Sequence, residues 1–213
     1  MSTRPRLRYL SERTARRMDA LLSSAIALRR PCDPEARRLA LWTAIETTNS
    51  WATFMRAYYL ASALGAWRAD RTRLTISVRQ RSAEEAITFS IATLKPTQIG
   101  SGPPWTSRQE PNWLDPANVS KLLHELGCAN ESGFQAAISL GTTVHQDLIT
   151  YRNFAAHRNR KSAEKVRSLA VRHRLPSHFD PIELPLQLLP QRSYTLLASW
   201  LYDLTTVISF VPR

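Results

Sequence analysis

The sequence predicts an all-α fold, a bundle of five to seven helices. Three observations lead to this expectation. Helix-start signals recur along the chain, apolar residues mostly repeat at helical spacing, and 43% of the 213 residues are hydrophobic, which is enough for a buried core. We expect a single domain over residues 1–213, with its core at about 10–175 and a C-terminal helix at about 193–210 packing on it.

Two long helices are expected in the first part of the chain. Residues 7–30 carry apolar positions on an arginine-studded helix. Asp33 and Pro34 then form a start signal, an N-cap followed by a first-turn proline, and Gly65 supplies the stop. This second helix would be about 45 Å long and would form the spine of the bundle. Its aromatic side chains are expected in the core: Trp42, Trp51, Phe54, Tyr58 and Tyr59.

The next segment is less regular. Three alternating apolar residues predict a short strand or an extended arm near residues 72–80. Ser82 and Glu85 have the spacing of a capping box, which would start a helix that continues to about Leu94. This segment is therefore expected to connect the long helices to the second half of the chain.

Helix signals dominate the second half of the chain. Asp115 followed by proline repeats the earlier start signal, and Gly127 closes that helix. A further helix is expected over 134–158, with Gly141 as the point where it could break. Ser162 would cap a short basic helix after it.

Positive charge is concentrated in two segments. The chain has 29 basic and 17 acidic residues, a net charge of +12. Residues 1–38 carry a net +6 and residues 151–174 a net +7, which makes polyanions the first partners to consider. Arginine supplies 25 of the 29 cations. This bias fits both phosphate recognition and the base composition of the genome.

Cysteine usage and apolarity exclude several classes of protein. Cys32 and Cys128 are too few for a disulfide framework or a zinc site, even with His124 four residues before Cys128. No segment has the length and apolarity of a signal peptide or a membrane span. We expect a cytoplasmic protein with no membrane partner, no metal and no cofactor.

The sharpest motif is Arg152-Asn153-x-x-x-His157 at the expected end of a helix. A histidine can move protons near neutral pH, and an arginine can stabilise the charge of a phosphorane, so the pair suits RNA cleavage. Asn153 and His157 share a helix face, whereas Arg152 and His157 point about 140° apart. His157 lies roughly opposite the apolar stripe of this helix, so it is expected to face solvent or a second chain. The stripe is formed by Val144, Leu148, Tyr151 and Ala155.

This arrangement resembles the HEPN superfamily, whose ribonuclease members carry an arginine followed several residues later by a histidine. Segments 41–60 and 112–127 also look like the central helix and the approach to the motif helix of that superfamily, so the resemblance covers about residues 10–175. It implies a HEPN-like bundle and a metal-independent endoribonuclease that uses 2′-hydroxyl attack. It also implies a composite active site at a homodimer interface and a role as toxin or effector in a bacterial toxin–antitoxin or anti-phage defence system.

The resemblance assigns roles to particular residues. Arg152 would stabilise the phosphorane, His157 would move protons and Asn153 would position them. A polar line on the long helix would orient His157 or contact RNA, unless it is a solvated face. It is formed by Glu46, Asn49, Thr53 and Arg56. Basic residues after the histidine would bind the flanking RNA phosphates: Arg158, Arg160, Lys161 and Lys165.

Other interpretations remain open. Arg152 and His157 could serve only to stabilise a helix end, and the chain could be a non-catalytic HEPN-like module that binds RNA or protein. A helix-turn-helix DNA binder ranks last, because no polar recognition helix is visible within residues 1–38, whose role is open. A cognate antitoxin or inhibitor protein is a possible partner. Toxins silenced by nucleotidyltransferase antitoxins often carry a tyrosine where this chain has Asn159, so that pairing is not supported.

Overall fold

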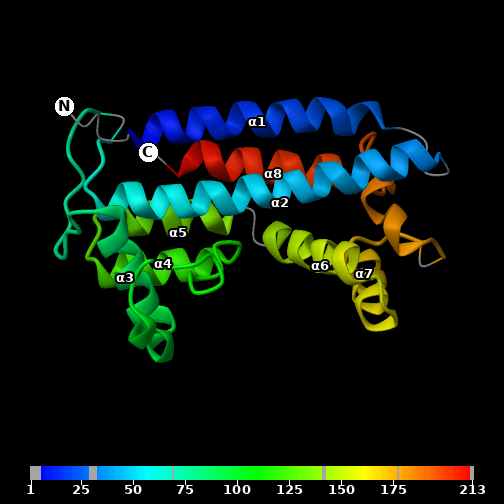
Figure 1. Ribbon diagram of the computed structural model, residues 1–213. Coiled ribbons are helices and arrows are strands. Elements are labelled where there is room, and N and C mark those ends of the chain that lie inside the picture. The colour runs from blue at the N-terminus through cyan, green and yellow to red at the C-terminus, as the bar shows by residue number, and fades with distance from the viewer. Residues whose placement is uncertain (1–5, 29–32, 69, 141–142, 177, 212–213) are drawn as a thin grey trace. The chain divides into compact units, whose positions relative to one another are not determined.

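Helices make up almost all of the regular structure. The computed structural model describes residues 6–28, 33–68, 70–140, 143–176 and 178–211. Within these residues there are eight α-helices, two short 3-10 helices and no strand (Figure 1). The all-α class is confirmed. The helices outnumber the expected five to seven because the segment expected as one helix over 134–158 forms two; Gly141, the expected break, lies outside the described residues.

The helices follow one another along the chain, and the longest connections are residues 64–82 and 102–115. In order they are α1 (Leu7–Ala27), α2 (Pro34–Ala63), α3 (Ala83–Leu94), η1 (Pro96–Ser101), α4 (Pro116–Glu125), α5 (Glu131–Ser139), α6 (Val144–His157), α7 (Arg160–Arg172), η2 (Pro181–Leu186) and α8 (Leu196–Phe210). The chain divides into two compact units. Unit 1 consists of Met1–Thr14, Ala52–Leu140 and Val207–Arg213, and unit 2 consists of Ala15–Trp51 and Gly141–Thr206. The single-domain organisation remains a prediction.

Side-chain caps fix the starts of three helices. The Asp33 and Asp115 carboxylates accept hydrogen bonds from the backbone N–H two residues further on, at 2.9 and 3.0 Å. Ser82 Oγ accepts the N–H of Glu85 at 3.1 Å, as the capping-box spacing predicts. The Glu85 carboxylate, however, accepts the N–H of Arg81 at 2.8 Å, one residue before the cap. These starts depend on local chemistry alone.

The segment near residues 72–80 is an extended arm and not a strand. The backbone N–H groups of Ser77 and Val78 both donate to the carbonyl of Leu126, at 3.1 and 3.0 Å. Gly127 follows with a φ of +60°, in the left-handed region that glycine adopts without strain. The arm therefore lies directly against the turn that ends α4.

Aromatic side chains of α2 contribute to the core of unit 1. The ring of Tyr58 stacks on Phe134 with 5.3 Å between centroids, and the ring of Tyr59 stacks on Trp113 at 5.4 Å. Asn130 Nδ2 donates to the Tyr58 hydroxyl at 2.6 Å. Burial of this kind raises the pKa of both tyrosines. Each ring thus combines apolar packing with a polar contact at its hydroxyl, since the hydroxyl of Tyr59 also donates to a backbone carbonyl.

One of the expected core aromatics is not in the core. Trp51, Phe54, Tyr58 and Tyr59 are buried, but Trp42 is 51% exposed. Its position explains the difference, because Leu39, Trp42 and Asn49 are exposed residues on one line of α2. Residue type favoured burial of Trp42, whereas its helical register places it on the solvent side.

The close approach of the arm to α4 generates a stability prediction. A Cβ added at Gly127 would lie 2.8 Å from the Cβ of Ser77, so Gly127→Ala incurs both left-handed backbone strain and a clash. We expect it to lower the free energy of unfolding by about 2–4 kcal/mol, as measured by urea denaturation. Gly65→Ala is the matched control, because Gly65 also has positive φ but its added Cβ would meet only the ends of the flexible Arg73 and Arg79 side chains, at 3.3 Å or more. It should cost only about 1 kcal/mol, and equal losses would contradict the proposed clash.

Candidate functional site

The motif residues lie on the solvent side of α6. Arg152, Asn153 and His157 are all exposed, and His157 is the last residue of the helix. The side chains of these three residues make no hydrogen bond or ion pair with another described residue. The buried side of α6 is formed by Val144, Asp147, Leu148, Tyr151 and Phe154. The expected stripe had Ala155 in place of Phe154, but the expected exposure of His157 is confirmed.

A tight corner joins α6 to α7. Arg158 adopts the left-handed conformation (φ 30°, ψ 42°), and its N–H donates to the carbonyl of Phe154 at 2.7 Å, which ends α6. Asn159 is the N-cap of α7: its side chain accepts the N–H of Ser162 at 2.9 Å, and Ser162 Oγ accepts the N–H of Asn159 at 3.1 Å. The sequence assigned the cap to Ser162, which instead completes the box from the third helical position. α7 therefore starts earlier than expected.

The corner places the candidate RNA-binding residues beside the motif. Arg158, Arg160, Lys161 and Lys165 are all exposed. Arg160 Nε lies 3.0 Å from Glu164 Oε1 in an exposed pair one helical turn apart, a geometry that contributes little to stability. Among the described residues, the other three basic side chains have no acidic partner. Their charge is consequently available to an anionic ligand.

A buried carboxylate joins the far ends of the α6–α7 hairpin. Asp147, in the first turn of α6, is fully buried. Its Oδ1 accepts Arg172 Nη1 at 2.6 Å, and its Oδ2 lies 2.6 Å from His173 Nε2, at the end of α7. Sequence reasoning missed this cluster. The available signal was an acidic residue four positions before Tyr151, on the apolar face of α6.

The two candidate residues on α2 do not contact the motif. Glu46 Oε2 accepts Arg17 Nη2 at 2.6 Å, and Glu46 Oε1 lies 3.4 Å from Asn49 Nδ2. No hydrogen bond within the described residues joins Glu46 or Asn49 to His157. Glu46 thus pairs α2 with α1 inside unit 2, and its proposed role in orienting His157 remains a prediction.

Arg56, further along the same polar line of α2, belongs to an ion pair in unit 1. Its guanidinium donates two hydrogen bonds to Glu110, at 2.7 and 2.8 Å, and Trp113 Nε1 donates a third at 2.8 Å. Burial opposes ionisation of Glu110, but the hydrogen bonds from Arg56 and Trp113 outweigh it and lower the pKa of the carboxyl group. This arginine is a structural residue.

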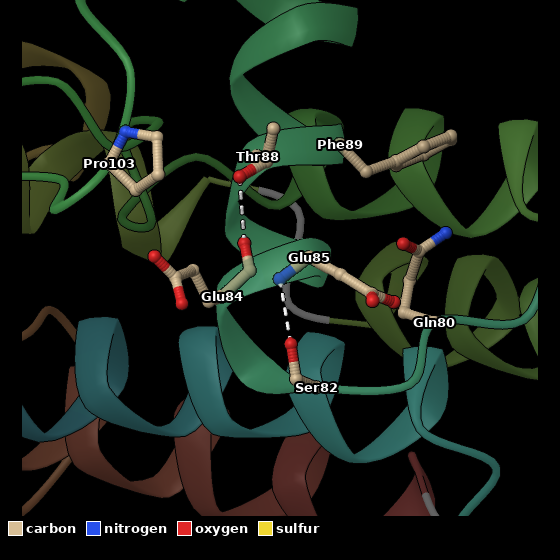
Figure 2. Close-up of a pocket in the computed structure, with 7 residues that line it drawn as sticks. All are labelled: Gln80, Ser82, Glu84, Glu85, Thr88, Phe89 and Pro103. Atoms are coloured by element: carbon tan, nitrogen blue, oxygen red, sulfur yellow. Dashed lines mark hydrogen bonds between the residues drawn. The ribbon is translucent and has the colours of Figure 1, made fainter.

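A surface cavity of about 610 Å³ lies at the start of α3 in unit 1. Figure 2 shows Glu84 and Glu85 among its lining residues, together with Gln80, Ser82, Thr88, Phe89 and Pro103. The lining contains two carboxylates and no basic side chain. Such a lining repels phosphate, so we do not place the nucleic-acid site there.

The described residues contain no cluster of metal ligands and no membrane-spanning helix. No three His, Cys, Asp or Glu side chains of these residues gather closely enough to hold a metal ion. In the same part of the chain, no helix combines the length and apolarity needed to cross a membrane. His124, which precedes Cys128 by one turn, pairs with Glu131 at 3.2 Å, and Cys128 is buried.

Comparison with known proteins does not place the chain in a family. No family model matches it, and neither a curated protein nor a solved structure gives a match. The assignment of the site therefore depends on the residues and their geometry.

The Asp147 cluster predicts a large effect of a small substitution. Asp147→Asn keeps the volume but removes the charge that accepts from Arg172 and His173. We expect the free energy of unfolding to fall by about 2–3 kcal/mol, as measured by urea denaturation. Glu164→Gln, which removes the exposed partner of Arg160, is the control and should change it by less than about 0.5 kcal/mol. An Asp147→Asn protein as stable as the wild type would show that the buried charge contributes nothing net.

The Arg56–Glu110 pair predicts a pH-dependent contribution. Because the pKa of folded Glu110 is lowered, its contribution to stability is complete above the ordinary glutamate pKa of about 4.3 and is lost as the pH falls through the folded value. We expect Glu110→Gln to lower the free energy of unfolding by about 1–2 kcal/mol at pH 7, and the gap to the wild type to close below about pH 4. Exposed Glu125→Gln is the control. A gap independent of pH would contradict the assignment.

Proposed function

We propose that this protein is a metal-independent endoribonuclease of the HEPN type that acts as a homodimer in the cytoplasm. The proposal depends on one observation, which is that the side chains of the motif are exposed and unbonded. Arg152, Asn153 and His157 are exposed at the end of a helix, their side chains make no hydrogen bond or ion pair to another described residue, and a basic helix follows directly. Residues that only stabilise a helix end would be expected to contact its carbonyl groups.

The chemistry needs only groups that the motif supplies. The RNA 2′-oxygen attacks the neighbouring phosphorus, the P–O5′ bond breaks, and the products are a 2′,3′-cyclic phosphate and a 5′-hydroxyl. A histidine accepts the proton of the 2′-hydroxyl, and a second proton donor protonates the leaving 5′-oxygen. Arg152 binds the non-bridging oxygens and stabilises the added negative charge of the phosphorane. Asn153, on the same face as His157, positions the proton-transferring group.

A second copy of the chain supplies what one copy lacks. Arg152 and His157 point about 140° apart on α6, so one helix does not direct both at the same phosphate. A two-fold axis next to the exposed face of α6 would bring two copies of each residue into one cleft. One His157 would then act as the base and the other as the acid. The resemblance to HEPN nucleases supports the same arrangement.

The basic residues of the corner and of α7 would bind the phosphates on either side of the cleaved bond. Arg158, Lys161 and Lys165 are exposed and have no acidic partner among the described residues, and Arg160 is only weakly neutralised by Glu164. The proposed activity would arrest growth when unrestrained. This consequence is the basis for proposing a toxin or effector of a toxin–antitoxin or anti-phage system, restrained by a cognate inhibitor protein.

A non-catalytic module is the alternative proposal. The observation that favours it is that no hydrogen bond joins the side chains of Arg152, Asn153 and His157. The exposed charges of α7 would hold RNA equally well without a cleavage step. In that case the motif residues would contact RNA or a protein partner and would not transfer protons.

Substitution of His157 separates the two proposals. We expect His157→Ala to lower the rate of RNA cleavage by about 10²- to 10⁴-fold, because proton transfer is lost, while the affinity for RNA changes little. Cleavage is measured on purified protein with end analysis for the 2′,3′-cyclic phosphate, and growth arrest is measured by inducible expression of each variant in one host. EDTA should leave the rate unchanged.

The matched control is His124→Ala, which removes an exposed histidine of unit 1 and should cleave like the wild type. If wild type and His157→Ala bind RNA equally and neither cleaves it, the binding module is the better description. Loss of cleavage on chelation would refute the metal-independent mechanism.

A further inference from the structure

A turn before α8 brings an arginine and a tyrosine together. The N–H of Arg192 donates to the carbonyl of Leu189 at 3.0 Å, and Gln191 has a φ of +62° after Pro190. Proline second and a positive φ third are the signature of a type II turn. The N–H of Leu189 donates to the carbonyl of Tyr194 at 3.2 Å, which closes the turn and leaves Arg192 and Tyr194 side by side.

The arginine and two tyrosines form one aromatic surface in unit 2. The guanidinium carbon of Arg192 lies 5.4 Å from the ring centroid of Tyr194, and Arg192 Nη1 donates to the Tyr194 hydroxyl. The Tyr194 ring meets that of Tyr202 edge to face, with 5.5 Å between centroids. Tyr202 is 43% exposed, whereas Tyr194 is half-buried. The ring of Tyr202 is therefore partly exposed to solvent, and its contact with Tyr194 holds it in place.

This aromatic surface adjoins the end of the basic helix. Asp203, next to Tyr202 on α8, is close enough to Arg192, His173 and Asp147 for their charges to act on it. Arg172, beside His173, gives one nitrogen to Asp147, and its side chain is still 48% exposed. Single-stranded nucleic acids are bound by aromatic rings on which bases stack, next to basic side chains that contact the backbone, and these rings and arginines have that combination.

We propose that Tyr202, supported by Tyr194 and Arg192, is a subsite that stacks one unpaired base of single-stranded RNA. This inference rests on the proposed function, in that it requires the chain to bind RNA. In this proposal a base, and not a phosphate, stacks on the ring of Tyr202. The carboxylate of Asp203, the next residue, repels anions but does not repel an uncharged base. The phosphates on either side of that base contact Arg172 and Arg192.

The test uses a short single-stranded 2′-O-methyl RNA, which cannot undergo 2′-hydroxyl attack. The oligonucleotide carries the fluorescent base 2-aminopurine, whose emission falls on stacking, and a second oligonucleotide has an abasic site there. Wild type and Tyr202→Phe should quench the fluorescence. Tyr202→Leu should abolish the quenching and bind the base-bearing strand roughly 5- to 100-fold more weakly, yet bind the abasic strand like the wild type. Tyr9→Leu, an exposed tyrosine of α1, is the matched control and should behave like the wild type.

Other results would overturn the subsite alone or the subsite together with RNA binding. Equal quenching and affinity for wild type and Tyr202→Leu would overturn the subsite and leave RNA binding intact. Failure of the wild type to bind either strand would overturn RNA binding and the subsite together. A Tyr202→Leu protein that binds both strands weakly, or binding of a protein partner by this surface in place of RNA, would also overturn the subsite.

A measurement on the unaltered chain covers the case in which Tyr202→Leu does not fold. A 4-thiouridine placed at the stacked position should crosslink the wild-type chain at Tyr202 or Tyr194, as mapped by mass spectrometry. Crosslinks confined to other segments would overturn the subsite.

Discussion

The buried carboxylate of Asp147 determines the geometry on which the proposed site depends. Burying an ionised carboxylate costs several kcal/mol unless charged donors satisfy it, and here both of its oxygens accept, one from Arg172 and one from His173. The carboxylate thereby ties the first turn of α6 to the end of α7. The other end of the hairpin is fixed by the Arg158 turn and the Asn159 cap. With both ends held, the motif and the basic residues of α7 are fixed relative to one another.

Ion pairs also reduce the positive charge that is available to an anionic ligand. Counted along the sequence, residues 151–174 carry a net +7, but Arg172 is partly neutralised by Asp147, which lies just outside that segment, and Arg160 pairs with Glu164. Within that segment, the basic side chains without an acidic partner among the described residues include Arg152 and Arg158 near the corner and Lys161 and Lys165 along the start of α7. In α1, Arg17 likewise pairs with Glu46. The two basic segments are therefore weaker anion sites than a charge count suggests, and position matters more than number.

Structural features that depend on contacts between residues close together in the chain could be predicted from the sequence. The caps at Asp33, Ser82 and Asp115 and the stop at Gly127 follow from hydrogen bonds within a few residues, so they could be located. The exposed side of α6 followed from helical periodicity in the same way. Asp147 could not be placed, because its partners Arg172 and His173 lie in a segment distant in sequence. Trp42 was misplaced because its residue type was given more weight than its helical register with Leu39 and Asn49. A tryptophan in an apolar helix is usually buried and an aspartate usually exposed, and each is the reverse here.

The two polar clusters of α6 have opposite characters, and this contrast is the strongest physical reason to look for function at the motif. Asp147 is buried and fully bonded, so removing a partner would be costly and its role in the folded chain is accounted for. The side chains of Arg152, Asn153 and His157 are exposed with no hydrogen bond or ion pair in the described part of the chain, so folding does not account for that combination. In the proposed function, the hairpin holds these side chains at its corner for proton transfer and phosphate binding. The ligand that matches a histidine, an arginine and a basic helix together is a phosphodiester.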